Sequence, residues 1–307
     1  MKQKFTLLAL LSVALLFSSS CKRSAQSYSN DNPAYVIYNS SGKKVSFNEM
    51  VKSLSSADIT LFGELHNDPI SHWLELELVK KLYEIKEEGF VVGAEMWEAD
   101  NQLVLDEMLK NKWIDMKAYQ ENSVLWSNFN TDYRPILHFA QEKEIPFVAT
   151  NVPRRYARIV SKRGDEALDS LSAQAQEYIA PLPIHMDMQD KFYTKIADIF
   201  KETLGGHTQS GTSITNIVKA QMVKDATMAH FIVNNLPKGG HLFHFHGELH
   251  SAFNSGIGYY IKHYNSKLKY KTISVVKMEN PLEFKAKESR ANFNIVVPEN
   301  MTVTHDN

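Results

Sequence analysis

Residues 241–250 read HLFHFHGELH, and this stretch decides how the rest of the chain is interpreted. It joins a short apolar run to a glycine, which is followed by a glutamate, a leucine and a histidine. The same four letters, GELH, occur at residues 63–66, directly after another apolar run. A short apolar run closed by glycine is typical of a strand buried on both faces, as in a parallel sheet. The repeat therefore predicts two such strands whose carboxyl ends carry the same polar groups.

Other runs of the same kind extend this prediction to a whole sheet. They are GFVVGAEMW at 89–97, IPFVATNVP at 145–153 and KTISVVKM at 271–278. Helical patterns lie between them; after the capping pair Asp68-Pro69, for example, leucines recur on one helical face. Alternating strands and helices predict an α/β fold, with a mainly parallel sheet flanked by helices.

The strand signal disappears between residues 155 and 236, where the patterns are helical throughout. We therefore expect a smaller helical subdomain at 155–236, inserted into an α/β domain made of residues 34–154 and 237–300. The last helical stripe stops at Pro237, which is followed by two glycines.

The N-terminus has the layout of a secretory signal: lysines, an apolar run from Phe5 to Phe17, and then small residues. We expect a signal peptide at 1–20 and a polar tether at 21–33. The chain's one cysteine, Cys21, stands where a bacterial lipoprotein signal would place a lipid-modified cysteine; plain secretion with a free thiol is the alternative. The predicted location is the cell envelope, with a lipid anchor in a bacterial membrane, the outer membrane foremost.

Composition excludes one class of partner. The formal charge is -1 and the hydrophobic share is 43%, which are ordinary values for a globular protein. Since the sequence shows no basic cluster suited to a polyanion, we expect no nucleic-acid partner.

The polar residues at the strand ends are the candidate site, because ligands of open parallel sheets bind beyond the carboxyl ends of the strands. If these strands are neighbours, one crevice gathers the candidate catalytic and binding residues. They are Glu64, His66, Glu95, Arg154, His246, Glu248 and His250.

This set of side chains permits more than one chemistry. Imidazole and carboxylate are ligands for zinc and related divalent ions, so His66, Glu95, His246 and His250 are the candidate metal ligands. Without a metal, a Glu–His pair can act as a base and its orienting partner. In a third interpretation the histidines only join strand ends. We expect structural roles for His72, His138, His230, His263 and His305, and both interpretations stay open for His241 and His244.

At these residues the sequence resembles the ChaN-like haem-binding uptake proteins of the Tiki superfamily. Tiki and TraB-type proteins share two Gly-x-x-His motifs at strand ends and a glutamate on a strand between them. Here these are Gly63 to His66, Gly247 to His250, and Glu95. The ChaN-like pattern adds Tyr133-Arg134-Pro135, Asn151-Val152-Pro153-Arg154 and the segment AQMVKDATMA at 220–229.

The resemblance implies an iron-acquisition lipoprotein that binds haem through a tyrosine and pairs two protomers around cofacial haems. No motif identifies the ligating tyrosine; from composition, Tyr193 with the nearby His185 is the candidate, and packing of Tyr193 in a helical core is the alternative. The second motif departs from the Gly-Asn-Gly-His-like form that is frequent in ChaN-like proteins. Its richer acid and imidazole content is similar to the enzymatic branches, which include Tiki-type metalloproteases and erythromycin-esterase-like hydrolases.

Three functions therefore stay open: a haem-binding uptake lipoprotein, a metal-dependent hydrolase of peptides or esters, and a non-enzymatic envelope protein. The first implies haem as cofactor and a homodimer around it; the second implies a divalent metal ion.

Overall fold

The computed structural model describes residues 32–203 and 213–305, and the described residues from Ala34 onward form one compact unit. The predicted signal peptide, Cys21 and nearly all of the predicted tether lie outside the described residues. Among the described helices, none is both long enough and apolar enough to cross a membrane.

A seven-stranded sheet forms the centre of this unit, in the order β1-β7-β6-β2-β5-β3-β4. Neighbouring strands are parallel except at one edge, where β1 runs antiparallel to β7. The strands are β1 (Val36–Asn39), β2 (Ile59–Glu64), β3 (Phe90–Glu98), β4 (Phe147–Asn151), β5 (His241–Gly247), β6 (Tyr270–Met278) and β7 (Phe293–Pro298). The predicted α/β fold with a mainly parallel sheet is confirmed.

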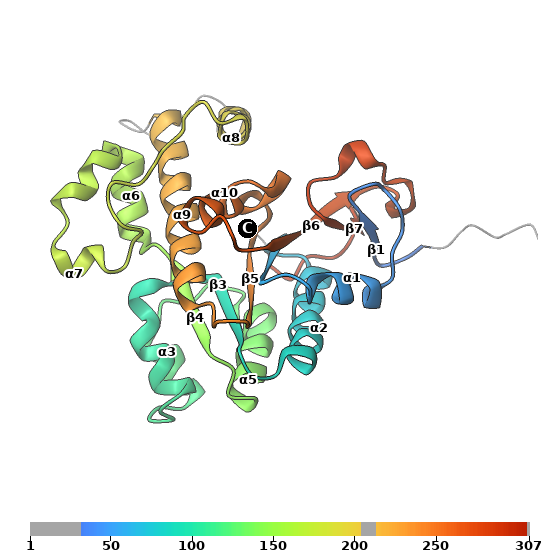
Figure 1. The fold of residues 1–307 in the computed structure, drawn as a ribbon, viewed down its shortest axis with the longest axis horizontal. Helices are drawn as coiled ribbons and strands as arrows, with labels where there is room; N and C mark the ends of the chain where they lie inside the picture. Colours follow the sequence, from blue (N-terminus) through green and yellow to red (C-terminus); the bar gives the residue numbers. More distant parts are fainter. Residues whose placement is uncertain (1–31, 204–212, 306–307) are drawn as a thin grey trace, which may run out of the picture. The chain divides into compact units, whose positions relative to one another are not determined.

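Helices cover both faces of the sheet, as Figure 1 shows. The helices of at least four residues are α1 (Phe47–Leu54), α2 (Pro69–Lys86), α3 (Gln102–Leu109), α4 (Met116–Asn122), α5 (Arg134–Glu142), α6 (Arg154–Arg163), α7 (Ala173–Gln176), α8 (Lys191–Thr203), α9 (Ile214–Asn235) and α10 (Ile257–Tyr264), together with a π-turn at Phe129–Tyr133 and a 3-10 segment at Asp165–Ser170. Helices α1 to α5 pack on one face, and α8, α9 and α10 pack on the other.

The side chains of β5 alternate between two faces of the sheet that are both buried. Every residue of β5 is buried. Phe243 and Phe245 enter the core on the α2 and α5 side, whereas Leu242 enters the core on the α9 side. A strand with both faces covered cannot show the polar alternation of a half-exposed strand.

Between Arg154 and Asn235 the described residues contain helices and turns but no strand. Helix α9 contacts β3, β4 and β5, so it belongs to the layer that covers the sheet. Helix α6 packs on the outer side of α9 through a separate apolar cluster.

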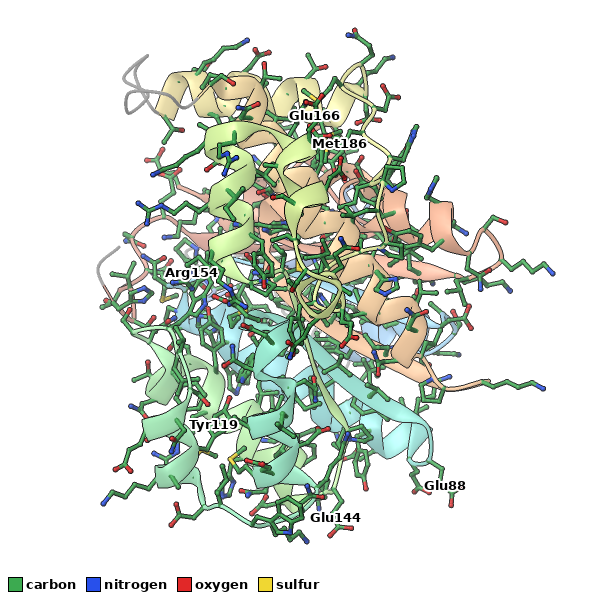
Figure 2. All side chains as sticks on the ribbon, turned by 90° about the vertical axis from the view of Figure 1, so that its left-hand side faces the viewer. Glu88, Tyr119, Glu144, Arg154, Glu166 and Met186 are labelled. Carbon is green, nitrogen blue, oxygen red and sulfur yellow. The ribbon has the colours of Figure 1, made fainter. Side chains whose placement is uncertain are left out.

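The strand order brings the two GELH segments together. Strand β5 lies between β2 and β3, and Glu64 pairs with Gly247 at the carboxyl end of the β2–β5 ladder. In Figure 2, Glu88 and Glu144, which precede β3 and β4, lie toward one end of the view, and Arg154, which follows β4, lies well away from them. The polar residues after β2, β3, β4 and β5 therefore share the carboxyl edge of the sheet.

Candidate functional site

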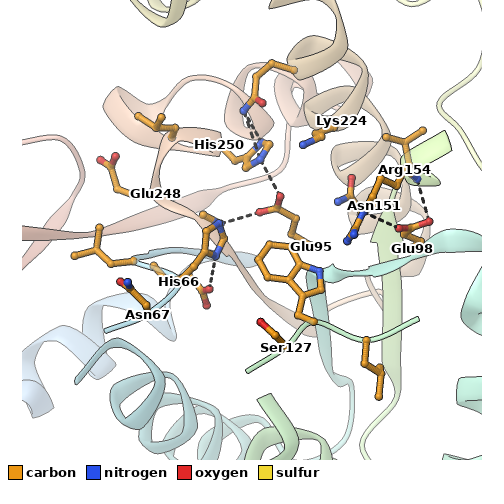
Figure 3. A pocket seen from close by; sticks show the side chains of 18 of the residues that line it. His66, Asn67, Glu95, Glu98, Ser127, Asn151, Arg154, Lys224, Glu248 and His250 are labelled. Carbon is orange, nitrogen blue, oxygen red and sulfur yellow. Dashed lines mark hydrogen bonds and ion pairs between the residues drawn. The ribbon is translucent and has the colours of Figure 1, made fainter. Parts of the chain in front are cut away.

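A cavity of about 860 Å³ opens at this edge, and its lining comes from the ends of five neighbouring strands, from α8 and α9, and from residues 125–127 (Figure 3). Its polar lining includes Glu64, His66, Glu95, Glu98, Asn151, Arg154, Gln221, Lys224, Glu248, His250 and Lys277. The structure thus brings most of the site residues that the sequence predicted to one cavity. That volume lies within the range of roughly 300–1,000 Å³ that is usual for small-molecule sites.

The first motif forms a glutamate–histidine pair. His66 Nδ1 lies 2.7 Å from Glu64 Oε1, and the Tyr133 hydroxyl donates to the same oxygen at 2.7 Å. The His66 side chain keeps 35% of its surface exposed and its ring packs against Trp126. Burial alone would lower the pKa of His66, but the hydrogen bond and charge of Glu64 raise it. Glu64 therefore orients His66 and stabilises its charged form.

The second motif places a histidine between two carboxylates. His250 Nδ1 faces the Asp225 carboxylate, and His250 Nε2 lies 3.1 Å from Glu95 Oε1. The other Glu95 oxygen accepts the backbone N–H of Gly247 at 2.9 Å. Figure 3 shows Glu95 between His250 and His66 at the floor of the cavity.

These contacts determine the protonation states of His250 and Glu95. Burial would lower the pKa of His250, but the charges of Glu95 and Asp225 outweigh burial and raise it to about 9. Burial would likewise raise the pKa of Glu95, whereas the charge of His250 holds it well below its usual value. At neutral pH His250 is therefore an imidazolium whose two N–H groups both point at carboxylates.

Gly247 is required by its contact with His66. A Cβ atom at this position would lie 2.7 Å from His66 Nε2 and 2.9 Å from Cε1. The backbone of Gly247 is in an ordinary extended conformation, so the glycine is needed for space and not for conformational freedom.

Two further histidines of β5 lie behind the cavity wall. Thr150 Oγ1 donates to Ala94 O at 2.8 Å, so His244 Nε2, at 2.7 Å from that hydroxyl, is the donor to it. His244 Nδ1 then accepts from His246 Nδ1 at 2.9 Å. Burial lowers the pKa of both rings, that of His244 to about 3 and that of His246 well below its usual value. His246 Nε2 is left buried without a hydrogen-bond partner among the described residues.

Glu248 and Arg154 line the cavity, but each forms an ion pair with another residue of the protein. Glu248 accepts from the Ser274 hydroxyl at 2.8 Å and pairs with Arg290 at 3.3 Å. Arg154 is largely exposed, and its Nε lies 3.4 Å from a Glu98 oxygen.

The candidate haem ligands chosen from composition lie outside the cavity lining. Tyr193 is buried among α8 and α9, and its hydroxyl donates to Asp225 at 2.8 Å. It therefore stands behind His250, as the last member of a chain of polar contacts. His185 is exposed and stacks on the ring of His263.

Sequence reasoning did not assign roles to Tyr133, Gln221 and Asp225, although each contacts a motif residue. The Gln221 amide lies 2.9 Å from His250 Nδ1. All three belong to the motifs Tyr-x-Pro and AQMVKDATMA, and Gln221 and Asp225 are one helical turn apart on α9. The spacing of Gln221 and Asp225, and the position of Tyr133 in its motif, were the signals that could have identified these residues.

The arrangement suits acid–base chemistry. His66, backed by Glu64, can take or release a proton at the cavity, and the imidazolium of His250 supplies positive charge beside it. Both nitrogens of His250 face carboxylates, which stabilise the protonated ring. Among the described residues, the one group of acidic and imidazole side chains whose ligand atoms lie within 4.8 Å of one another is Glu64, His72 and Glu75, below the cavity.

Comparison with known proteins gives the family. Residues 50–261 match the profile described as haem-binding uptake, Tiki superfamily, ChaN. No curated protein matches the chain.

Solved structures give the fold. ChaN of Campylobacter jejuni, solved with cofacially bound haem, has a TM-score of 0.67 and 18% identity, over 87% of this chain and 98% of its own. Weaker similarities include the erythromycin esterase EreC in an open conformation, with a TM-score of 0.43 and 13% identity over 87% of this chain and 83% of that one. The toxin effector domain RRSP from Vibrio vulnificus has a TM-score of 0.42 and 15% identity, over 85% of this chain and 40% of that one.

Proposed function

The chain belongs to the haem-binding uptake family of the Tiki superfamily that includes ChaN, and from this premise we propose that it binds haem in the cavity at the carboxyl edge of the sheet. The observation that carries the proposal is the composition of the cavity wall, which combines apolar and basic side chains. Its apolar members are Leu65, Leu125, Trp126, Val152, Phe200 and Leu249.

Haem requires an apolar surface for the porphyrin and partners for two propionates. Trp126 and its apolar neighbours supply the first requirement. Lys224, Lys277 and Arg154 supply positive charge for the second. Lys224 forms no ion pair with another described residue, so its ammonium group is available to a ligand carboxylate. The apolar and basic side chains that line the cavity therefore fit a bound haem.

A haemin titration of the mature chain tests this proposal. We expect a Soret band that saturates near one haem per chain, with affinity lowered about tenfold or more in Trp126→Ala, because the porphyrin loses a stacking surface. Trp113→Ala is the matched control, since Trp113 is 74% exposed and does not line the cavity. Equal affinities for the two variants, or no saturable band in the wild-type protein, would reject the site.

We also propose that the mature protein is a lipoprotein of the cell envelope, anchored through Cys21. The motif at the end of the predicted signal supports this. Expression of the full chain in a bacterium should place it in the membrane fraction, and Cys21→Ser should release it or leave it unprocessed. A wild-type protein recovered wholly in the soluble fraction would contradict the anchor.

Pairing of two protomers around haem is the corresponding proposal for assembly. It is supported by the cofacial haem binding of the similar ChaN of Campylobacter jejuni and by the exposure of His66 at the cavity. Sedimentation with and without haemin should show the monomer giving way to a dimer as haem is added. A monomer at both conditions rejects the pairing.

Hydrolysis of an ester or peptide is the second candidate function, favoured by the two Glu–His pairs on one cavity floor. His66 would act as the base, oriented by Glu64, and His250 as the source of positive charge at a developing oxyanion. With p-nitrophenyl acetate as the probe, His66→Ala should slow turnover about a hundredfold or more. His138→Ala, at an exposed position of α5, is the control. If His66→Ala and the control retain the same rate, the pairs are not catalytic.

A further inference from the structure

A second polar cluster lies beneath the cavity, on the α2 side of Glu64. It is buried: Glu64, Asp68, His72, Glu75, Asn128 and Asp132 each have at most 6% of their surface exposed. The residues come from the end of β2, from the first turns of α2 and from the π-turn before α5. This cluster does not face the cavity except through Glu64.

The cluster has more hydrogen-bond acceptors than donors. Four of its side-chain oxygens are buried with no hydrogen-bond partner among the described residues: Glu64 Oε2, Asp68 Oδ2, Glu75 Oε1 and Asn128 Oδ1. The acidic members pair with histidines and with no described lysine or arginine. Buried lone pairs without donors are costly, so these oxygens need a proton or a cation as a partner.

His72 shows where that partner belongs. Its Nε2 lies 3.1 Å from the carbonyl oxygen of His66, which can only accept, so Nε2 carries the proton. In the neutral ring the lone pair is then on Nδ1. This atom lies 3.3 Å from Glu75 Oε2 and 3.8 Å from Glu64 Oε2. His72 thus offers one ligand atom that, with one oxygen each from Glu64 and Glu75, forms a group whose atoms lie within 4.8 Å of one another.

The separations are those of ligands around an ion. Charge-assisted N–H···O contacts are shorter, about 2.7–2.9 Å. Ligand atoms placed about 2.0–2.1 Å from a tetrahedral zinc ion lie about 3.4 Å from one another. A ligating histidine also usually donates its other N–H to a backbone carbonyl or carboxylate, as His72 does to His66 O.

We propose that Glu64, His72 and Glu75 bind a divalent first-row metal ion, for which zinc is the reference species. One nitrogen and two carboxylate ligands suit this class of ion. Because the ligands are buried, the ion enters as the chain folds and stabilises the folded state.

The ion would also fix the cavity. Glu64 Oε1 receives both His66 and the Tyr133 hydroxyl, whereas its Oε2 is the oxygen that faces His72. A metal at Oε2 holds the carboxylate in one orientation, and the carboxylate in turn holds His66. The inference does not depend on whether the cavity takes haem or an ester.

The test is the metal content of the full-length mature protein, prepared without chelators and refolded with or without Zn²⁺. We expect about one ion per chain in the wild type and in Glu77→Gln, and less than a tenth of that in Glu75→Gln and His72→Gln. Glu77 is the matched control, because it lies on α2 but pairs with Lys80 near the surface. An ion bound to the cavity histidines would survive Glu75→Gln, which separates the two sites.

Thermal unfolding supplies an independent measurement on the wild type alone. Zinc should raise Tm by about 5 °C or more and EDTA should remove the gain, whereas Glu75→Gln should respond to neither. The rival occupant is a proton shared by the carboxyls. If the refolded wild type holds no stoichiometric metal and its Tm ignores both zinc and EDTA, the proton is the occupant and the metal site is rejected.

Discussion

Asp225 and His250 meet in the core although 25 residues separate them, and the contact joins α9, which covers the sheet, to the segment that directly follows β5. With Glu95 on the other side, the ring of His250 is held as a cation. The positive charge of His250 therefore depends on Glu95, which lines the cavity, and also on Asp225, which does not.

Asp225→Asn tests this dependence on pH. The folded pKa of His250, about 9, exceeds the unfolded value, so its contribution to stability is fully present below pH 6.5 and is lost as pH rises to 9. The wild type should lose up to about 3 kcal/mol across this window, and Asp225→Asn should lose clearly less. Urea unfolding at several pH values, with the His250 resonance followed by NMR, measures both quantities. Parallel stability curves for the two proteins would contradict the assignment.

His241 should affect the pH dependence of stability in the opposite direction to His250, and at acid pH. Burial lowers its pKa to about 4, and the neutral ring is hydrogen-bonded to Thr60 and to the carbonyl of Ala57. The unfolded chain takes up a proton near pH 6.5 that the folded chain refuses, so stability falls as pH drops from 6.5 to 4. His241→Gln should reduce the slope of the free energy of unfolding against pH by the equivalent of up to about one bound proton. His138→Gln, at an exposed position, should leave this slope unchanged. Equal slopes would mean that His241 titrates normally.

Gly247→Ala should disable the cavity with little effect on the fold. The added Cβ would lie 2.7 Å from His66 Nε2, so the ring must leave its place beside Glu64. Gly258→Ala is the control, because its Cβ would crowd the Tyr270 hydroxyl to the same degree at a position that does not line the cavity. We expect haem affinity and any ester turnover to fall in the first variant only. The comparison fails if both variants, or neither, lose ligand binding.

Tyr193→Phe distinguishes a structural tyrosine from an iron ligand. The hydroxyl donates to buried Asp225, so its removal should destabilise the fold by about 1–2 kcal/mol. The absorption spectrum of bound haem should stay unchanged, because Tyr193 lies outside the cavity lining. A shifted Soret band with unaltered stability would instead support ligation by Tyr193.

The sheet was predictable because its central strands are buried on both sides. The two apolar runs that end in GELH correspond to β2 and β5. The runs GFVVGAEMW and IPFVATNVP correspond to β3 and β4. The edge strand β1 and its neighbour β7 were not anticipated, since Val36–Asn39 is short and pairs only with a strand more than 250 residues away. Local patterns carry no information about such a partner.

The candidate site was predictable to the extent that parallel strands bring their carboxyl ends together. The cavity gathers Glu64, His66, Glu95 and His250. What the sequence could not supply was the tertiary network behind them. Asp225 contacts His250 because α9 packs on the sheet, and no local pattern in the helix indicates this contact. His72 contacts Asp132 because α2 packs against the π-turn.

The position of β5 has a consequence for synthesis on the ribosome. This strand enters between β2 and β3 after more than two thirds of the chain has emerged, and the cavity lining includes its last residue and the three residues that follow it. Until then β2 and β3 each have an edge with unpaired backbone groups, which is a template for aggregation. A nascent chain that stops short of residue 241 therefore has no pocket to fill, and the ligand can be loaded only after translation has passed the second motif.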